Sequence, residues 1–265
     1  MTDRLAEVLA DLAREGDRLE ELVAPLDEPG WRTPTPAEGW DVGHQIAHLA
    51  WTDEVAVAAA TDEAAWHGYV LRAMEDPTGF VDAEAASGAR APHRELLDRW
   101  RSARRRLAEV LAAHPAGQKI PWFGPPMSPT SMATARFMET WAHARDVADA
   151  LGVDLPCDDA VRHVVHLGVR TRDFAFRNAG KEPPAEELRV ELVLPSGEPL
   201  AFGPEAAAQT VRGSAYDFAL LVTQRAHRDD LDLVATGPDA DAWLDLAQAF
   251  AGPSGPGREP RGSHA

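Results

Sequence analysis

Phe137-Met138-Glu139-Thr140-Trp141-Ala142-His143-Ala144-Arg145-Asp146 is the stretch from which the fold and the function of this chain can best be argued. It is typical of an α-helix, and Glu139 and His143 stand four residues apart, so both side chains project from one face. That face would otherwise be expected to carry apolar residues. A carboxylate and an imidazole there indicate a polar site inside a helical fold.

A second predicted helix carries two more imidazoles at the same spacing. It runs over Asp41-Val42-Gly43-His44-Gln45-Ile46-Ala47-His48-Leu49-Ala50-Trp51, with Asp41 as its N-cap. A carboxylate and histidines on facing helices are what a divalent-metal site in a helix bundle needs. We predict His48, Glu139 and His143 as the three ligands. His44, one turn before His48, is a candidate fourth ligand, a donor to a ligand, or an acid/base group.

The ligand set favours a catalytic metal over a structural one. Two imidazoles and a carboxylate leave at least one coordination position for water or substrate. Structural zinc sites are normally closed by four protein ligands, often cysteines, and this chain has one cysteine, Cys157. The alternative is coincidence, because Glu and His four residues apart occur by chance in many helices and the chain has ten histidines.

Composition narrows the class of protein. The formal net charge is −17, from 43 acidic and 26 basic residues among 265. We therefore expect no nucleic-acid partner and no anionic membrane, since each phosphate contact needs Lys or Arg. A single cysteine allows no intramolecular disulfide, and the sequence shows neither a signal peptide nor a membrane span. These features predict a cytoplasmic protein and give no signal for the oligomeric state. The open position of the predicted metal site is what predicts a small-molecule substrate.

The first part of the chain predicts a bundle of four main helices. Apolar residues recur at helical spacing over residues 2–24, from 41 to about 74, over 93–114 and over 130–151. The second of these helices either continues or breaks near Thr61-Asp62. Residues 25–40 and 115–129 are proline-rich loops, and 76–92 are expected to be irregular. With a crossing connection these helices make a four-helix bundle.

After a helix over residues 158–179, the pattern changes to short strands. Strands are predicted at 188–194, 199–202, 209–212 and 231–235, with helices at 216–225 and 239–250. The predicted fold class is therefore α+β. The predicted domains are a helix bundle over 1–155 and a small α+β domain over 156–250, with helix 158–179 as a bridge. A flexible tail is predicted over 251–265.

Two motifs resemble a known family. Gly39-Trp40-Asp41-Val42-Gly43-His44-Gln45-Ile46-Ala47-His48-Leu49 resembles the N-terminal signature of DinB-like metalloproteins, in the branch named for mycothiol-dependent maleylpyruvate isomerase. That signature is a Gly-Trp, a short polar spacer, and a helix ending in a ligand His followed by Leu. The family's later Glu-x-x-x-His matches Glu139 and His143. The resemblance covers residues 1 to about 150 and implies a DinB-like bundle with His48, Glu139 and His143 as ligands; His44 lies outside the family pattern.

Two segments near the C-terminus extend the resemblance. Residues 213–227, Gly213-Ser-Ala-Tyr-Asp217 to Gln224-Arg225-Ala-His227, resemble the C-terminal part of an actinobacterial, metal-binding subgroup of this family. Residues 247–258 do so too. What the resemblance implies is chemistry with a low-molecular-weight thiol such as mycothiol, either isomerisation of an unsaturated diacid or transfer of the thiol to an electrophile. The metal we expect is zinc, with nickel or iron as alternatives.

An anionic substrate would need cations near the metal. Arg136, seven residues before His143 on roughly the same face, and Arg225, on a helix of the second domain, are predicted to fill this role, Arg225 by reaching across an interdomain cleft. Each has an alternative as a surface ion-pair residue. The tryptophans expected to wall an apolar pocket, or else to pack in the core, are Trp40, Trp51, Trp122 and Trp141.

Two other classes of function stay open. One is a metal-dependent lyase, cyclase or hydrolase of a specialised metabolite that needs no thiol, in which the metal activates water or a carbonyl. The other is a non-enzymatic protein that binds a metal and an apolar ligand. Activity without added thiol would favour the first, and a coordinatively closed metal would favour the second.

Overall fold

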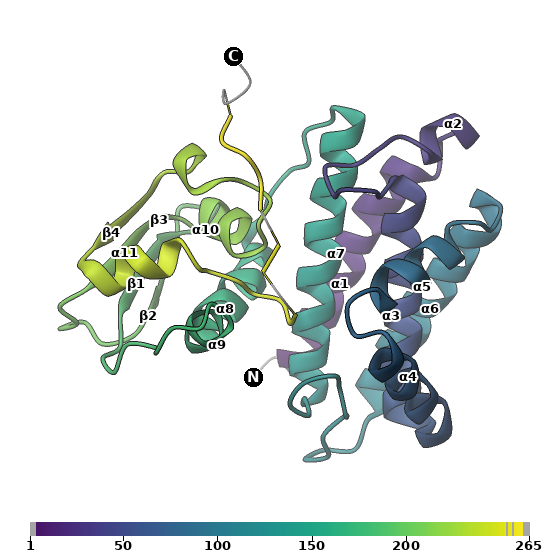
Figure 1. Ribbon diagram of the computed structural model, residues 1–265, viewed down its shortest axis with the longest axis horizontal. Coiled ribbons are helices and arrows are strands. Elements are labelled where there is room, and N and C mark those ends of the chain that lie inside the picture. The colour runs from purple at the N-terminus through teal and green to yellow at the C-terminus, as the bar shows by residue number, and fades with distance from the viewer. Residues whose placement is uncertain (1–3, 253, 256, 262–265) are drawn as a thin grey trace. The chain divides into compact units, whose positions relative to one another are not determined.

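The structure, a computed structural model, describes residues 4–252, 254–255 and 257–261. The chain divides into two compact units, one ending at Leu155 and the other beginning at Pro156 (Figure 1). The first unit is all helical and the second combines helices with one sheet. The sequence predicts the same arrangement along the chain, a helix bundle followed by an α+β domain.

Four long helices build the first unit, and they lie side by side in Figure 1. They are α1 (Arg4–Val23), α3 (Val42–Thr61), α6 (His93–Ala113) and α7 (Pro129–Leu151). Three short helices, α2 (Glu28–Trp31), α4 (Glu63–Glu75) and α5 (Phe80–Gly88), lie in the connections. Helix α1 packs mainly on α7, and α3 packs on both α6 and α7. The two helices with the predicted ligands are therefore neighbours.

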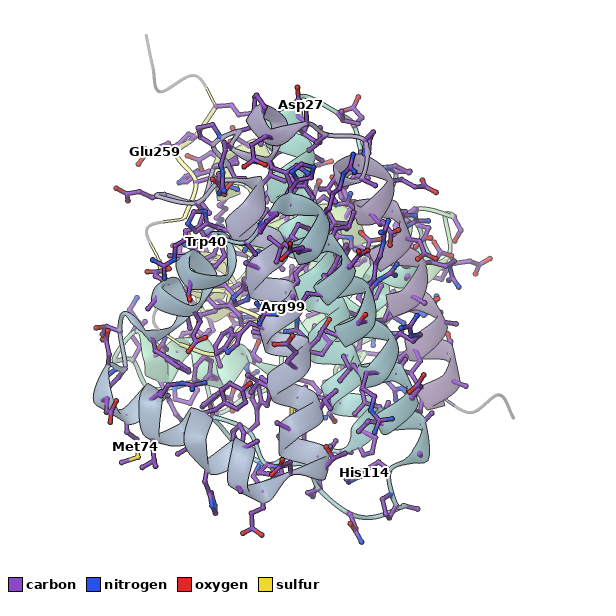
Figure 2. All side chains as sticks on the ribbon, turned by 90° about the vertical axis from the view of Figure 1, so that its right-hand side faces the viewer. Asp27, Trp40, Met74, Arg99, His114 and Glu259 are labelled. Atoms are coloured by element: carbon purple, nitrogen blue, oxygen red, sulfur yellow. The ribbon has the colours of Figure 1, made fainter. Side chains whose placement is uncertain are left out.

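The core of the first unit follows from the apolar faces of its helices. Leu19 of α1, Ile46 of α3 and Trp100 of α6 are buried in one cluster. Each such side chain contributes about 1.5–3 kcal/mol by leaving water. Arg99 of α6, which is labelled in Figure 2, donates two hydrogen bonds, of 2.7 and 2.6 Å, to the carboxylate of Glu54 on α3. Apolar burial and this bidentate pair hold α3 against α6.

The ends of α7 are defined by local chemistry. Ser128 is the N-cap and accepts a hydrogen bond from the backbone N–H of Ser131, and Pro129 occupies the first turn. Gly152 ends the helix in the left-handed conformation, with φ of 65°. The predicted helix over 130–151 is therefore found with a shift of one residue.

The second unit holds a four-stranded mixed sheet in the order β2-β1-β3-β4. The strands are β1 (Arg189–Val193), β2 (Pro199–Phe202), β3 (Thr210–Ser214) and β4 (Leu233–Thr236). β1 pairs with β3 in parallel, with Val190 opposite Val211, and the other two pairings are antiparallel. The helical segments are η1 (Asp159–Val161), α8 (Arg162–Arg170), α9 (Arg172–Asn178), α10 (Ala215–Val222), η2 (Arg228–Asp230) and α11 (Pro238–Leu244). The buried rings of Phe218 and Trp243 pack edge to face in the core of this second unit.

Three sequence predictions about helices were wrong. Residues 80–88, expected to be irregular, form α5, because the alanines of this segment favour a helix, which begins after Gly79 and ends at Gly88. The helix expected over 158–179 is interrupted at Thr171, whose hydroxyl shares its one proton among the carbonyls of Leu167, Gly168 and Gln248. The last helix ends at Leu244 rather than near 250.

The early end of α11 has a local cause. The buried side chain of Gln248 donates to the carbonyls of Phe250 and Gly252, and the backbone N–H of Ala249 donates to Val222 at the end of α10. These bonds replace the helical ones. The tail predicted over 251–265 falls partly on 253, 256 and 262–265, which lie outside the described residues. In its described part, the N–H of Arg261 donates to the carboxylate of Asp230.

Across the described ranges, none of the helices combines the length and the apolar character that crossing a bilayer requires. The cytoplasmic location stays a prediction.

The cap of α3 gives a test of the fold. Asp41 Oδ1 accepts a hydrogen bond of 2.9 Å from the backbone N–H of His44. We expect Asp41→Ala to lower the free energy of unfolding by about 1 kcal/mol, because one backbone N–H of the first turn loses its acceptor. Asp41→Ser should keep most of the stability. Urea unfolding of the chelator-treated proteins, followed by circular dichroism, measures both, and an Asp41→Ser loss as large as that of Asp41→Ala would contradict the capping role.

Candidate metal centre

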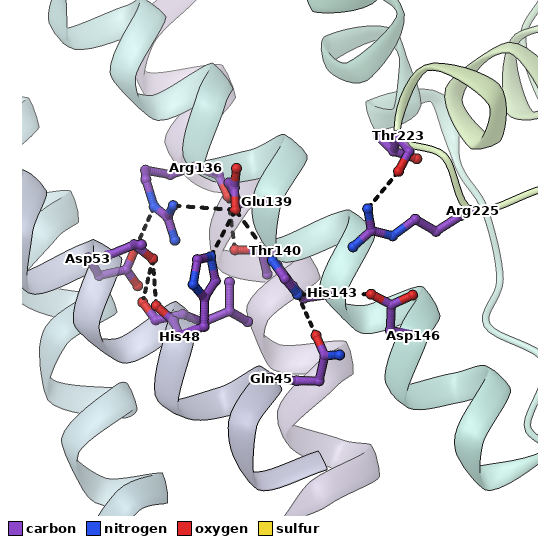
Figure 3. A network of polar contacts seen from close by, with 12 residues as sticks. Gln45, His48, Asp53, Arg136, Glu139, Thr140, His143, Asp146, Thr223 and Arg225 are labelled. Atoms are coloured by element: carbon purple, nitrogen blue, oxygen red, sulfur yellow. Dashed lines mark hydrogen bonds and ion pairs between the residues drawn. The ribbon is translucent and has the colours of Figure 1, made fainter. Parts of the chain in front are cut away.

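The three predicted ligands meet between α3 and α7 (Figure 3). His48 Nε2 lies 3.2 Å and His143 Nε2 lies 3.4 Å from the same oxygen, Glu139 Oε2. One donor atom from each residue falls within 4.8 Å of the others. The four-residue spacing on α7 puts Glu139 and His143 on one face, and the packing of α3 brings His48 to it. Their role as ligands stays a prediction.

The three side chains differ in their access to water. Those of His48 and His143 are 9% and 12% exposed, and that of Glu139 is 25% exposed. Burying polar groups costs free energy unless each finds a partner. His48 Nδ1 is buried and has no hydrogen-bond partner within the described part of the chain. Two imidazole nitrogens and a carboxylate oxygen that converge in a largely dry site fit a divalent ion. Water or a substrate could reach that ion from the side of Glu139, the most exposed of the three side chains.

Electrostatics keep Glu139 in the form that binds a metal. Burial by itself would raise the pKa of the Glu139 carboxyl. Hydrogen bonds from His143 and His48, together with the charges of His48 and Arg136, hold that pKa well below its ordinary value. Glu139 is therefore a carboxylate at neutral pH, as a metal ligand must be.

Aromatic rings enclose the two imidazoles. The indole of Trp40 stacks on His143, with ring centroids 6.0 Å apart and planes 13° apart, and its centroid lies 5.3 Å from that of His48. The ring centroids of His48 and Trp51, both on α3, lie 6.0 Å apart. These rings restrict the orientation of the histidines and keep water from their faces. Two of the four predicted wall tryptophans therefore contact the centre.

The other two predicted wall tryptophans lie elsewhere in the structure. Trp122 stacks on Trp66 of α4 at 6.1 Å, and Trp141 is buried beneath the guanidinium of Arg145, 4.7 Å from its ring. Trp141 is buried in the core, and Trp122 packs against the cluster that contains Trp51 and Trp66. A place in the pocket wall stays a prediction for both.

Gln45 is a site residue that the sequence analysis missed. Its side-chain oxygen contacts His143 Nδ1 in a short hydrogen bond, and the residue is fully buried. Gln45 precedes His48 by three residues, so it lies on the same face of α3, and a buried amide beside a ligand was the available signal. Asp146 Oδ2 lies 4.0 Å from the same Nδ1.

Arg136 lies behind Glu139 in a buried ion pair. Its Nε donates to Asp53 Oδ1 at 2.8 Å, and its Nη1 is 4.0 Å from Glu139 Oε2 (Figure 3). Arg136 and Asp53 are both buried. Burial raises the pKa of Asp53, which outweighs the opposing effect of Arg136. The alternative of a surface ion pair is therefore wrong for Arg136. Its role in substrate binding stays a prediction, and this geometry favours positioning Glu139.

The remaining predicted site residues, His44 and Arg225, are placed differently. His44 Nδ1 lies 2.6 Å from Asp41 Oδ1, within the cap of α3, and His44 is not part of the group that could hold a metal. Arg225 follows α10 in the second unit, where its Nη1 donates to the carbonyl of Thr223 at 2.6 Å. Arg225 and the three predicted ligands lie in different units, and the predicted approach of Arg225 to the metal stays a prediction.

A cavity of about 520 Å³ lies elsewhere in the first unit. Apolar residues of α1 and α6, such as Leu12 and Trp100, form much of its wall, and Asp53 and Thr140 also line it. None of the three predicted ligands lines this cavity. It lies behind the Arg136–Asp53 pair and is not the candidate reaction site.

Comparisons with known proteins agree with this architecture. The family model of the mycothiol maleylpyruvate isomerase N-terminal domain matches residues 12–148. Two uncharacterised proteins of Mycobacterium tuberculosis, from strains CDC 1551 and H37Rv, are each 55% identical over 250 residues, which is 94% of this chain and 97% of the relative.

Solved structures show the same fold. The crystal structure of the mycothiol-dependent maleylpyruvate isomerase is 18% identical, covers 90% of this chain and 98% of its own, and superposes with a TM-score of 0.59. A mutant of that enzyme with one histidine replaced by alanine is 17% identical over the same shares, with the same score. The predicted fold class, a helix bundle followed by a small α+β domain, is confirmed.

The ligand assignment can be tested by metal analysis. We expect about one divalent ion per chain in the wild-type protein, and a loss of affinity of more than about 100-fold in His48→Ala and Glu139→Ala, beyond what the loss of an outer partner causes. His67→Ala is the matched control, since His67 is exposed on α4. Elemental analysis and competition with a chromogenic chelator measure the content and the affinity. Equal metal content in the wild type and both ligand variants would refute the assignment.

The buried pair gives a prediction about stability. Asp53→Ala should lower the free energy of unfolding by about 3–5 kcal/mol, because the Arg136 charge is left buried without its partner. The double variant Asp53→Leu/Arg136→Met should lose clearly less, since neither member of the pair leaves an unpaired buried charge behind. Urea unfolding of the two variants and the wild type makes the comparison. A double variant at least as unstable as Asp53→Ala would show that the pair itself contributes the stability.

Proposed function

This chain belongs to the family of the mycothiol maleylpyruvate isomerase N-terminal domain, and from that premise we propose that it is a metal-dependent enzyme that uses a low-molecular-weight thiol such as mycothiol. Its reaction is isomerisation of, or sulfur transfer to, an unsaturated anionic small molecule. The observation that carries the proposal is the convergence of His48, Glu139 and His143 with one partly exposed side. Both the metal and the thiol are proposals here.

Each of the three residues of the centre would supply one atom to hold an ion. His48 and His143 would present Nε2, and Glu139 would present Oε2, the atoms that face one another across the gap between α3 and α7. A divalent ion, most simply zinc, would supply Lewis-acid stabilisation of a thiolate at neutral pH. Trp40 and Trp51 exclude water from the imidazole faces, which strengthens electrostatic interactions at the site.

The thiolate sulfur is the nucleophile in this proposal. Its addition to an activated double bond converts that bond to a single bond, about which the substrate can rotate. Elimination then restores the double bond in the other geometry and releases the same thiolate, so the isomerisation consumes no thiol. If the adduct is protonated before elimination, the product is a thioether and the reaction is a transfer. The distinction depends on whether a proton donor reaches the adduct carbon.

The negative charge of the substrate needs a cation to hold it. In the described part of the first unit, Arg136 is the arginine beside Glu139, and its Nε is paired with Asp53. Because that pairing offsets its charge, we retain Arg225 as the proposed cation for a substrate carboxylate. Arg136 would instead act by holding Glu139.

A thiol-dependent assay tests the proposed function. We expect the chelator-treated protein to be inactive on maleylpyruvate, and activity to require both restored zinc, nickel or iron and added mycothiol. Isomer conversion is followed by proton NMR. Glu139→Gln should lose more than about 100-fold in turnover, and His67→Ala should not, because His67 is exposed on α4 away from the ligand group.

Three experimental results would contradict this proposal and favour another function. Turnover that needs metal but ignores the thiol would favour a lyase or hydrolase, and full activity in excess chelator would remove the metal from the mechanism. A bound metal that resists chelation, in a protein with no turnover, would favour a binding protein.

A further inference from the structure

The cavity of about 520 Å³ in the first unit is lined mainly by residues of α1 and α6 and by none of the predicted metal ligands. Leu9 and Leu12 of α1, with Trp100 and Ala108 of α6, give it apolar walls. Its volume falls within the range of small-molecule sites, which are mostly apolar and carry a few polar groups. The cavity therefore has the size and the lining to hold a small molecule with an apolar part.

One wall of this cavity is held in place without any ligand. Ala13 and Gly16 of α1 line the cavity and have little or no side chain to fill it. A Cβ at Gly16 would lie 2.8 Å from Arg104 Nη1, so the glycine lets Arg104 cross from α6 to α1. There Arg104 Nη1 donates to Asp17 at 2.8 Å, and the guanidinium lies over Trp100, 5.2 Å from the ring centroid. A wall that is formed in advance reduces the ordering cost of binding.

Two carboxylates that line the outer part of the cavity are paired with arginines. Glu20 accepts hydrogen bonds from Arg101, at 2.9 Å, and from Arg104. Glu109 accepts a hydrogen bond of 3.2 Å from Arg106. Because these negative charges are already offset, they do not give the cavity a negative potential that would exclude an anion.

Arg105 is the cation at the cavity whose charge is not offset in this way. It lines the cavity and is exposed, and within the described part of the chain it forms no ion pair. Unpaired cations are unexpected in a protein with a net charge of −17. Charge complementarity at the edge of this apolar cavity therefore favours an anionic group on the ligand.

The inner wall determines which end of a ligand carries the charge. Asp53 and Thr140, each 3% exposed, line the cavity on its buried side. Asp53 is the acidic half of the buried pair with Arg136, and the Thr140 hydroxyl donates its proton to the Arg136 carbonyl at 2.9 Å. A carboxylate buried beside them would have neither a cation nor a donor, at a large cost in desolvation. The charge of the ligand must therefore lie at Arg105, with the apolar part inside.

We propose that this cavity is a binding site for a small amphipathic carboxylate of the medium-chain fatty acid class. Its carboxylate lies at Arg105, and its apolar chain extends inward past Leu12 and Trp100. The site is separate from the candidate metal centre. The inference goes beyond the proposed function and does not depend on the metal or the thiol.

Titration calorimetry of the chelator-treated, metal-free protein tests this binding. The probe is decanoate, below the concentration at which it forms micelles, and we expect one decanoate to bind per chain. Hexanoate should bind at least about 10-fold more weakly, because each buried CH₂ is worth up to about a fourfold change in affinity. Decanol should bind about threefold more weakly than decanoate, since it has the same chain without the charge.

Arg105→Gln tests the position of the charge. It removes the cation without leaving a carboxylate unpaired, so decanoate should bind about threefold more weakly while the affinity for decanol stays unchanged. Arg94→Gln is the matched control, because Arg94 is exposed near the start of α6 and does not line the cavity. It changes the net charge by the same amount and should bind both ligands like the wild type.

Ala108→Trp tests the position of the apolar chain. The added ring occupies the cavity, so decanoate and decanol should both bind about 10-fold or more weakly than to the wild type. Ala113→Trp, at the exposed last residue of α6 and outside the cavity, should leave both affinities unchanged. If circular dichroism shows that Ala108→Trp does not fold, Ala13→Trp replaces it, since Ala13 lines the cavity from α1 and is exposed.

Several results would overturn the inference. They are the lack of saturable decanoate binding, an equal effect of Arg105→Gln on decanoate and decanol, and wild-type affinity in a folded tryptophan variant of the cavity. A dimer in analytical ultracentrifugation that the same tryptophan variant dissociates would assign the cavity to contact between two copies of the chain instead. No metal is bound in these experiments, so a failure here leaves the proposed function untouched.

Discussion

The packing of α3 against α7 is the constraint on which the rest of the structure depends. Both helices bury polar side chains where a bundle would ordinarily bury apolar ones: Gln45, His48 and Asp53 on α3, and Arg136 on α7. A buried polar group without a partner costs about 1–3 kcal/mol, so each must be satisfied by the opposite helix. The hydrogen bonds from α7 to α3 therefore fix the register of the two helices, and a metal would join them at the same place.

Much of the fold and the three candidate ligands could be predicted from the sequence because they depend on local spacing. The separation of Glu139 and His143 determines a shared face whatever the helix packs against. Apolar periodicity identified the four long helices. The wrong predictions concern marginal segments, such as residues 80–88 and the interruption at Thr171, where side-chain bonds and tertiary packing decide the outcome rather than propensity.

Partners that are far apart in the sequence could not be predicted in this way. Asp53 and Arg136 are 83 residues apart, and Gln45 and His143 are 98 apart. Nothing in the spacing of either segment says which polar residue of one helix meets which residue of the other. Arg136 was expected near the metal for its charge, but only the fold shows that Asp53 occupies its Nε. A sequence can therefore nominate the ligands more readily than the residues that orient them.

The loop over residues 33–41 explains how two helices can hold a rigid site. Helix α3 begins only at Val42, yet the indole of Trp40 contacts both imidazoles, and its Nε1 donates to Asp82 of α5 at 2.9 Å. One side chain thus restrains both histidines and ties them to a third helix. Pro34 and Pro36 restrict the unfolded loop, which reduces the entropy lost when it orders. The proline-rich approach to α3 is therefore part of the centre, because the orientation of each imidazole depends on where this loop lies.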